Sequence, residues 1–428
     1  MEVIKAPRGT RDVLGDESWK WAHVLDVCRK TADDFGYSEV LLPIFEHTEL
    51  FSRGIGDTTD VVEKEMYTFI DRGDRSITLR PELTASMVRS YLEHEMRRMP
   101  QPVKLWSAGP MFRYERPQKG RYRQFWQIDF EILGVSNPMS DLETIDTSME
   151  IYRRLGLTNL QVLTNSVGCP KCRPVYREAL KSFISSSPGG LGGLCETCQG
   201  RFDRNPLRIL DCKIPRCKEL TESAPSMIDS LCDECREHFD SVTRGLSRID
   251  ADVRIDNRLV RGLDYYTKTA YEILAGELGS QNAVCGGGRY DNLSEAIGGP
   301  HVPGVGFASG IERIVLTLEG QGVYIGKKPE IDVYIVTASV DAAIEASALA
   351  HELRSVGLAV DLDYARRAMK AQMKHASSIG ASFVCIIGGD EMASGAIGVK
   401  NMKSGEQMSV PRSETAARIA SWGEEMVK

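Results

Sequence analysis

The stretch FRYERPQKGRYRQFWQIDFEILG, residues 112–134, decides how the chain is expected to fold. It contains a basic loop at 116–120, which joins two predicted strands, 103–115 and 121–134, into a hairpin. Successive side chains of the second strand point to opposite faces of the sheet. One face receives Gln127, Asp129 and Glu131, and the other receives Trp126, Ile128, Phe130 and Ile132. A polar face on such an apolar strand is unusual for a purely structural element, so the hairpin predicts an antiparallel sheet with a functional face.

Four groups of residues could bind an anionic or planar ligand, and all of them lie in the first 325 residues. They are Arg113 with Gln127 and Glu131; Glu82 with Thr84, which we predict as a helix N-cap; Arg261 with Tyr265 and Tyr266, followed by CGGGRYD (285–291); and Arg313 in GFASGIERIVL (306–316). The planar fork of arginine suits phosphate and carboxylate, and consecutive glycines let the backbone approach a ligand. Each group also has an ordinary structural interpretation. These are a cross-strand ion pair, a helix cap, a β-bulge and an exposed side chain, respectively.

The composition limits these interpretations. At 428 residues the chain is long enough for two to four domains, and its 42% hydrophobic and 26% charged residues are ordinary for a globular protein. No apolar run approaches the roughly 18 residues of a membrane span, and the first residues lack the apolar core of a signal peptide. We therefore expect a cytoplasmic protein with no membrane partner. The net charge of −7 disfavours a general polyanion binder but leaves room for local basic patches.

Most of the 11 cysteines lie in pairs between residues 169 and 235. The pairs are Cys169 and Cys172, Cys195 and Cys198, Cys212 and Cys217, and Cys232 and Cys235. In a chain without an export signal, such pairs favour thiolate metal ligands over disulfides. Four sulfurs placed tetrahedrally close a structural Zn²⁺ site, so we predict structural zinc, with a redox-active or simply reduced cluster as the alternative. The sequence leaves open which pairs share an ion and whether there are one or two ions.

The order of predicted elements divides the chain. Consecutive strands and hairpins indicate one α+β domain in two parts, 1–168 and 241–325, interrupted by a cysteine-rich helical insertion at 169–240. From about residue 330 strands alternate with helices, which indicates a small α/β domain over 330–428.

Taken in their order along the chain, these motifs resemble those of the histidyl-tRNA synthetases, which are class II aminoacyl-tRNA synthetases. The hairpin residues FRYERPQKGRYRQFWQ…E resemble the second motif of the class, and GFASGIERIVL resembles the third. GYSEVLLPIFE (36–46) resembles the first motif, which forms the dimer, while RLVRGLDYY (258–266) and GGGRYD (286–291) resemble two signatures of the histidine enzymes. The resemblance covers nearly the whole chain.

The resemblance implies a catalytic antiparallel sheet flanked by helices and a C-terminal α/β anticodon-binding domain. It also implies a homodimer that uses ATP with Mg²⁺ to attach L-histidine to tRNA(His) through a histidyl-adenylate, releasing AMP and pyrophosphate. For the nucleotide it assigns Arg113 to the α-phosphate and to the histidine carboxylate, Arg313 to the γ-phosphate end, and Arg121 to a further ATP contact. The chemistry adds Arg261, because activation brings two anions together and two arginines flanking the reacting atoms, Arg113 and Arg261, fit that requirement. For histidine it assigns Glu82, Thr84 and Gln127 to the ammonium group, Glu131 and Tyr266 to the imidazole, and Tyr265 to the shape of the pocket. Gln118 would approach the acceptor end of the tRNA.

Some features depart from the family pattern. Leu83 stands where glycine is common, Asp129 adds a carboxylate with no assigned role, and the eight inserted cysteines belong to a subset of the family. Arg258 lacks support as a ligand contact and is expected to be structural. A regulatory subunit of ATP phosphoribosyltransferase shares the fold, but such proteins typically lack the anticodon-binding domain and lose motif arginines. A zinc-ribbon nucleic-acid protein would leave the hairpin and the glycine motif unexplained.

The C-terminal domain carries one basic stripe. We predict a helix over 366–379, on which Arg366, Lys370 and Lys374 fall at positions i, i+4 and i+8, with Arg367 adjacent. The stripe is a candidate tRNA contact, and a solvated helix face is the equally weighted alternative.

Overall fold

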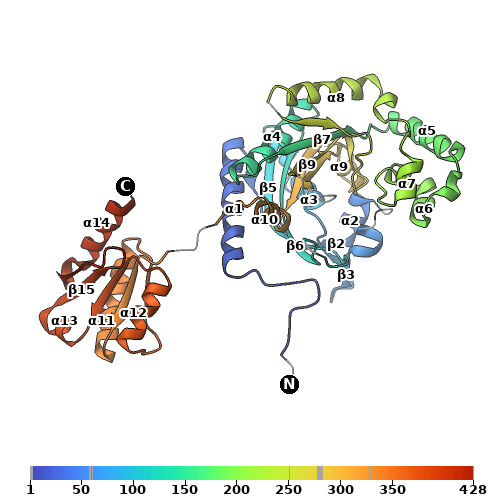
Figure 1. Cartoon of the computed structure of the whole chain (residues 1–428). Helices are drawn as coiled ribbons and strands as arrows, with labels where there is room; N and C mark the ends of the chain where they lie inside the picture. The colour runs from blue at the N-terminus through green and yellow to red at the C-terminus, as the bar shows by residue number, and fades with distance from the viewer. Residues whose placement is uncertain are drawn as a thin grey trace. The chain divides into compact units, whose positions relative to one another are not determined.

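The chain forms two compact units, Met1–Gly326 and Lys327–Lys428 (Figure 1). The structure is a computed structural model that describes residues 3–56, 59, 61–118, 120–249, 251–276, 283–326 and 330–427. In these ranges, no helix combines the length and the apolar character that crossing a membrane requires.

An eight-stranded sheet forms the centre of the larger unit (Figure 1). In spatial order its strands are β1 (Ser38–Glu39), β5 (Val103–Phe112), β6 (Gln124–Leu133), β11 (Gly304–Gly310), β10 (Ala283–Arg289), β9 (Thr267–Ala275), β7 (Leu160–Ser166) and β8 (Val253–Ile255). All neighbours from β5 to β7 are antiparallel, whereas the edge pairs β1–β5 and β7–β8 are parallel. The predicted α+β fold is therefore confirmed, and the sheet is mixed because a parallel pair closes each edge.

One face of this sheet carries the main apolar core. It packs against α1 (Asp16–Phe35), α4 (Pro138–Arg154), α8 (Asp233–Leu246) and α10 (Ile311–Gly320). Ile128, Phe130 and Ile132 of β6 lie in this core, as the alternation predicts. Phe130 stacks on Trp106 and Phe307 of the neighbouring strands, with ring centroids 5.6 and 5.1 Å apart. Because apolar side chains fill this side, the polar side chains of β6 point to the opposite face.

Smaller elements stand beside that opposite face. They are a three-stranded sheet of β2 (Phe45–His47), β4 (Ser76–Leu79) and β3 (Tyr67–Ile70), with α2 (Thr48–Ile55), α3 (Thr84–Glu93) and α9 (Leu293–Ala296), the π-helical turn η1 (Val61–Glu65) and the 3₁₀ turn η2 (Met96–Arg98). The prediction that Thr84 is the N-cap of α3 is wrong. Glu82 provides the cap, because its carboxylate accepts hydrogen bonds from the backbone N–H groups of Thr84 at 2.7 Å and Ala85 at 3.0 Å. A carboxylate at this position also complements the positive end of the helix dipole.

The cysteine-rich segment lies between β7 and β8 of the main sheet. Its helices are α5 (Cys172–Ser186), α6 (Glu196–Arg204), α7 (Pro215–Leu220) and α8, with the 3₁₀ turns η3 (Gly190–Gly193), η4 (Pro206–Ile209) and η5 (Ile228–Ser230). Tyr176, Leu180 and Ile184 of α5 belong to an apolar core of its own. The segment is tied to the sheet through α8, because the imidazole Nε2 of His238 lies 3.0 Å from Asp141 Oδ1 of α4.

The smaller unit is a five-stranded sheet with helices. Its strands run in the order β13 (Val360–Leu362), β12 (Val333–Thr337), β14 (Phe383–Ile387), β15 (Ala396–Asn401) and β16 (Gln407–Pro411). The first three are parallel and the last two antiparallel. Its helices are α11 (Val340–Ser355), α12 (Met369–Ser378), α13 (Gly389–Ser394) and α14 (Thr415–Val427), with the 3₁₀ turn η7 (Arg412–Glu414). The predicted α/β character is confirmed.

The predicted helix over 366–379 begins too early. Helix α12 starts at Met369, and Arg366 has a left-handed φ of 54° in the turn before it. The cause is Asp363, which accepts a hydrogen bond from the Arg367 backbone N–H at 2.8 Å and forms an ion pair with the Arg367 guanidinium. Arg366 therefore does not continue the helical row of Lys370 and Lys374, although all three side chains are exposed.

Candidate active site

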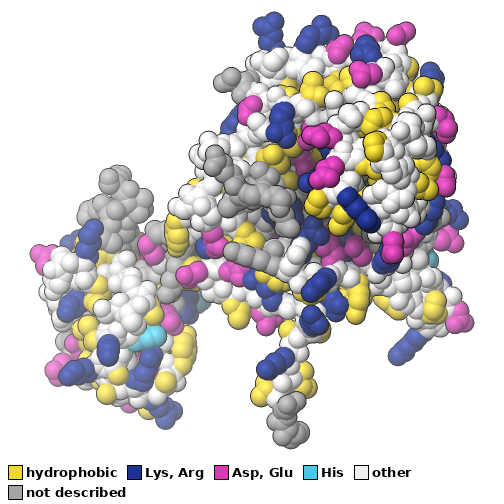
Figure 2. Space-filling view, turned by 45° about the vertical axis from the view of Figure 1, so that its right-hand side comes forward, with side chains coloured by type: hydrophobic (Ala, Val, Ile, Leu, Met, Phe, Trp, Pro, Cys, Tyr) yellow, Lys and Arg dark blue, Asp and Glu magenta, His cyan; other side chains and the backbone are white. Residues whose placement is uncertain are grey.

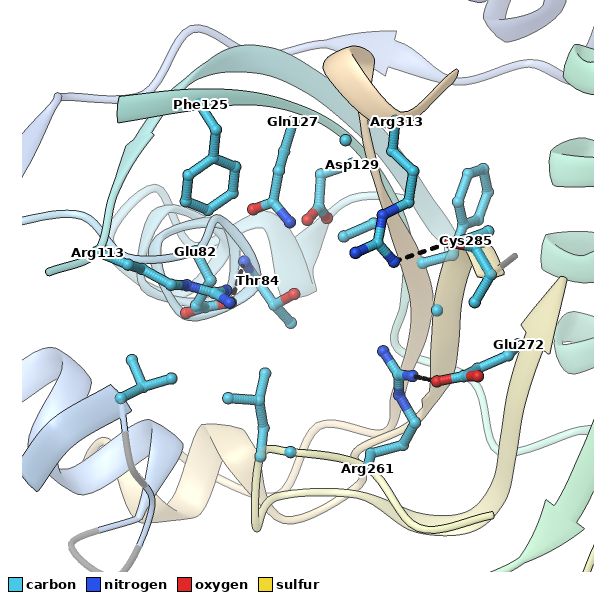
Figure 3. Close-up of a pocket in the computed structure, with 18 of the residues that line it drawn as sticks. Glu82, Thr84, Arg113, Phe125, Gln127, Asp129, Arg261, Glu272, Cys285 and Arg313 are labelled. Atoms are coloured by element: carbon cyan, nitrogen blue, oxygen red, sulfur yellow. Dashed lines mark hydrogen bonds and ion pairs between the residues drawn. The ribbon is translucent and has the colours of Figure 1, made fainter. Parts of the chain in front are cut away.

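A cavity of about 400 Å³ opens on the polar face of the main sheet (Figure 3). All ten residues that the sequence assigns to histidine or ATP line it: Glu82, Thr84, Arg113, Arg121, Gln127, Glu131, Arg261, Tyr265, Tyr266 and Arg313. They come from strands, helices and loops separated by up to 231 positions along the chain (313 − 82). The fold therefore brings the separate sequence motifs together in one site.

Glycines form part of the floor of this cavity. A Cβ at Gly286 of β10 would overlap the guanidinium of Arg261, and a Cβ at Gly306 of β11 would overlap the carboxylate of Glu131. Both positions therefore require glycine because charged side chains lie directly on the sheet. The close approach of Arg261 explains Gly286, the first glycine of the triplet, while the register of β10 and β9 shifts between Gly288 and Arg289.

Four arginines, Arg113, Arg121, Arg261 and Arg313, line one part of the cavity together with two carboxylates, Glu115 and Glu272. Arg313 donates from Nη1 to the backbone oxygen of Ala283 at 2.9 Å, and burial lowers the pKa of its guanidinium. The charges of Arg121 and Arg261 lower that pKa further. Arg113 donates to the Pro81 backbone oxygen at 2.8 Å and lies 4.0 Å from Glu115. Mutually repelling cations in one cavity favour a ligand that carries several negative charges.

Arg261 is held by a partner on the floor of the site. Its guanidinium forms an ion pair with Glu272 of β9, drawn as a dashed line in Figure 3, and lies 6.0 Å from the centre of the Tyr266 ring. Burial disfavours the charge of Arg261 most strongly, but Glu272, Tyr266 and Cys285 together outweigh that effect and raise the pKa of the guanidinium. Arg261 is therefore a fixed, permanently charged group.

Carboxylates and tyrosines line another part of the cavity. Glu131 accepts a hydrogen bond from the Tyr290 hydroxyl, and burial raises the pKa of Glu131. Tyr265 packs against Tyr266 with ring centroids 4.7 Å apart and against Tyr290 at 5.7 Å. Leu83, which replaces a glycine common in the family, is fully buried immediately before α3. This part of the site can recognise a planar ring that carries N–H groups.

The loop that carries Arg261 and Tyr266 is supported by the cysteine-rich segment. Arg208 of η4 donates to the Arg261 backbone oxygen at 3.1 Å, and Asn205 donates to the Asp264 carboxylate at 2.6 Å. Arg258 lies outside the cavity lining and donates to the backbone oxygens of Leu210 and Thr221 at 3.0 and 2.9 Å. These contacts agree with its predicted structural role.

The cysteines form two groups of four, and in each group the sulfur atoms lie within 4.8 Å of one another. One group contains Cys169, Cys172, Cys232 and Cys235, and the other contains Cys195, Cys198, Cys212 and Cys217. In the first group the Sγ atoms of neighbouring cysteines lie 3.6 to 3.8 Å apart, and in the second group the Sγ atoms of Cys195 and Cys212 lie 3.9 Å apart. A tetrahedral Zn²⁺ with Zn–S bonds of about 2.3 Å needs sulfurs about 3.8 Å apart, whereas a disulfide needs about 2.05 Å. The donor set and its spacing therefore fit two zinc ions.

Sequence reasoning missed three residues that shape the site. Glu272, the partner of Arg261, carried no local signal beyond its position within an apolar strand. Tyr290 was visible within GGGRYD, but only the folded chain places its hydroxyl on Glu131. Arg208 reaches the cavity from the inserted segment, and no local pattern predicts that contact.

Known proteins resemble this chain over nearly its whole length. The family model described as histidyl-tRNA synthetase matches residues 9–170 and 216–314, and the model described as anticodon binding domain matches residues 332–422. The histidine–tRNA ligase of Desulforamulus reducens is 52% identical over 94% of this chain and 96% of its own length, and that of Pelotomaculum thermopropionicum is 50% identical over 94% of both. The crystal structure of apo S. aureus histidyl-tRNA synthetase matches with a TM-score of 0.83 at 39% identity, covering 98% of this chain and 100% of that one.

The mixed sheet with its arginine-lined cavity, joined to an anticodon-binding domain, defines an aminoacyl-tRNA synthetase of class II. The matched family model omits residues 171–215, so it leaves out much of the cysteine-rich segment. The chain belongs to the histidyl-tRNA synthetase family.

Proposed function

We propose that this chain attaches L-histidine to tRNA(His) in two steps, by forming histidyl-adenylate from ATP and then transferring the histidyl group to a hydroxyl of the tRNA, with AMP as the leaving group. The observation that carries this proposal is the division of one cavity into arginines and carboxylates. Arginines suit the phosphates of ATP, whereas the carboxylates and tyrosines suit the ammonium group and imidazole of histidine. The family relationship supports the reaction, and the charges of the cavity support the roles proposed below for these residues.

In the first step a histidine carboxylate oxygen attacks the α-phosphorus of ATP. A new P–O bond forms to the carboxylate, the bond to the bridging oxygen breaks, and pyrophosphate leaves with the electron pair. Two anions must approach each other in this step. The fixed positive charges of Arg113 and Arg261 stabilise the negative charge that this approach concentrates on the reacting oxygens. Removing one such preorganised donor typically costs about 10²–10³ in rate. Arg121 and Arg313 bind the outer phosphates. The cavity arginines repel one another, and the negative charge of the phosphates would relieve that repulsion.

Bound together with the nucleotide, Mg²⁺ would supply positive charge that offsets the charge of the outer phosphates. Glu115 and Glu272 line the cavity and offer the carboxylate oxygens that Mg²⁺ prefers.

At the amino-acid end, Glu82, Thr84 and Gln127 bind the ammonium group of histidine. Glu131 accepts from a ring N–H of the imidazole, and Tyr266 binds the ring beside it while Tyr265 shapes the pocket. A site that pairs with ring N–H groups rejects amino acids lacking them, because its own buried polar groups would be left unpaired.

The second step requires tRNA at the mouth of the cavity and on the smaller unit. Gln118 is exposed in the hairpin loop beside Arg121, where it can contact the acceptor end. On the smaller unit, Arg366, Lys370 and Lys374 are exposed candidates for a tRNA contact, and Tyr364 next to them is 75% exposed. Exposed aromatic side chains beside cations can stack on unpaired bases. In the view of Figure 2, acidic and basic side chains are interspersed over the larger unit, so localised contacts are expected to act here.

The two groups of four cysteines are proposed to bind one structural Zn²⁺ each. The support is the chemistry and spacing of the sulfurs, which match tetrahedral coordination. We also propose the domain limits 1–168 with 241–325 for catalysis, 169–240 for the zinc-binding insertion and 330–428 for anticodon binding.

A homodimer in the cytoplasm is the proposed working form. Leu41 is 81% exposed and Phe45 is 57% exposed, and both lie in the stretch that resembles the dimer-forming motif. Exposed apolar side chains grouped in this way are typical of an interface.

ATP–pyrophosphate exchange with each of the twenty amino acids tests the proposal. Histidine alone should support exchange, and the purified protein should charge tRNA(His). Exchange that does not respond to histidine would contradict the proposed function.

A further inference from the structure

Asp129 is buried in the active site, and the reaction described above gives it no role. It lies on the same face of β6 as Gln127 and Glu131, lines the cavity and has no exposed surface (Figure 3). Among the described residues, no donor forms a hydrogen bond with either of its carboxylate oxygens, and the same is true of the Gln127 side-chain oxygen. Buried carboxylates without donors are costly, so these oxygens mark a place where a ligand must supply N–H or O–H groups.

The surroundings of Asp129 are mainly acidic. Burial, followed by the charge of Glu131, a side-chain hydrogen bond shared with Glu131 and the charge of Glu82, raises the pKa of Asp129 well above its ordinary value. Arg80 is a cation that acts on it, but the guanidinium of Arg80 donates to the backbone oxygens of Leu42 and Pro110 at 2.9 and 3.0 Å. Asp129 therefore has no dedicated cation to balance its negative charge. A positively charged ligand group would balance it.

The other candidates for binding an ammonium group are already partly occupied. Glu82 uses its two oxygens to cap α3, one for the N–H of Thr84 and one for that of Ala85. Glu131 accepts from the hydroxyl of Tyr290 and faces the tyrosines. An ammonium group has three donors and one full charge, so a buried site without a carboxylate to receive it binds it poorly. Asp129 is the carboxylate in this part of the cavity whose oxygens accept from no N–H or hydroxyl group of the described residues, and its side-chain neighbour is a second acid, Glu131.

We propose that Asp129 is a further histidine-binding residue, whose carboxylate accepts a hydrogen bond from the α-ammonium group of the substrate next to Gln127. The inference rests on the proposed histidine activation and deepens it. In this arrangement Gln127 and Asp129 bind the ammonium group through oxygens that accept from no other N–H or hydroxyl group, beside Glu82, whose carboxylate also caps α3. Asp129 thus selects an α-amino acid, and Glu131 selects the ring.

The test compares Asp129→Asn with the unmodified protein, using two histidine analogues as competitive inhibitors of pyrophosphate exchange. L-Histidinol has the ammonium group and the imidazole but lacks the carboxylate, whereas 3-(imidazol-4-yl)propionate lacks the ammonium group. The asparagine variant keeps the shape, and its amide can donate to the neighbouring Glu131. We expect the inhibition constant of histidinol and the KM for histidine to rise at least about tenfold, as for loss of one charge-assisted hydrogen bond. The inhibition constant of the propionate and the KM for ATP should change less than about twofold.

Equal weakening of both analogues would overturn the proposal, because it would indicate a general distortion of the pocket. Unchanged binding of histidinol would overturn it as well. Asp129→Ala, which removes the side chain without adding an amide, should give the same selective loss, so the result does not depend on one variant. Failure of the proposed function is separate, since it would appear as histidine-independent exchange in the unmodified protein.

Discussion

Replacement of Arg258 by alanine tests whether the inserted segment supports the catalytic loop. The Arg258 guanidinium donates three hydrogen bonds to the insertion, to Leu210 O at 3.0 Å, to Thr221 O at 2.9 Å and to Thr221 Oγ1 at 2.9 Å. At about 1 kcal/mol net for each hydrogen bond, their loss weakens local docking by ~3 kcal/mol. That energy corresponds to a roughly hundred-fold larger population of the undocked loop.

Hydrogen exchange of the backbone amides in residues 256–266 measures this population directly. In Arg258→Ala we expect exchange in this loop to be faster by roughly a hundred-fold where opening limits it, with slower histidine activation because Arg261 and Tyr266 lie in the same loop. Arg254→Ala is a matched control in the same chain segment. The Arg254 side chain is 59% exposed and lies 3.6 Å from Asp256, so its loss should change little. If the two variants exchange equally and retain equal activity, the support of the loop by the insertion is refuted.

Four other expectations concern the site, the metal, the pH dependence and the dimer. Arg261→Ala should slow pyrophosphate exchange by roughly 10²-fold or more, as for loss of one preorganised donor, while tRNA binding measured by filter retention stays intact; normal turnover would remove Arg261 from catalysis. Cys217→Ser should lower the zinc content measured by elemental analysis from two ions per chain towards one. The control Cys385→Ser, in the smaller unit, should leave the zinc content unchanged. Native protein without zinc would favour a redox role for the cysteines instead. Burial raises the pKa of Glu131 to about 7, so the stability that its protonated form provides is fully present below pH 4.5 and is lost as the pH rises through 7. Glu131→Gln should therefore raise the melting temperature at pH 8 but not at pH 4, and an equal shift at both would contradict this cause. Phe45→Asp should convert a dimer to a monomer in light scattering, and an unchanged mass would exclude this surface from the interface.

Much of the fold could be predicted because it depends on residues that are neighbours in the chain. The alternation over 121–134 placed Gln127, Asp129 and Glu131 on one face and Phe130 in the core, which the structure confirms. The same local logic located the strands and helices of the C-terminal unit. It misplaced the start of α12, because Asp363 binds Arg367 and turns the chain before the helix begins.

The contacts that complete the site could not be predicted in this way. Glu272 meets Arg261 only because the loop folds back over β9, and the hydroxyl of Tyr290 reaches Glu131 only when β10 and β11 are in register. The cysteine pairs were evident, but their grouping depends on α8 returning to the start of α5.

By itself, then, the amino-acid sequence determined the two kinds of sheet, the polar face of the hairpin, the cysteine pairs and the set of motifs that indicates the family. These properties follow from periodicity, spacing and residue chemistry, which act between near neighbours. Only the tertiary structure decided which cysteines lie together, which carboxylate fixes Arg261, and that Asp129 is buried without a donor. Those properties depend on how distant segments pack, and packing is set by the closure of the whole sheet and its core.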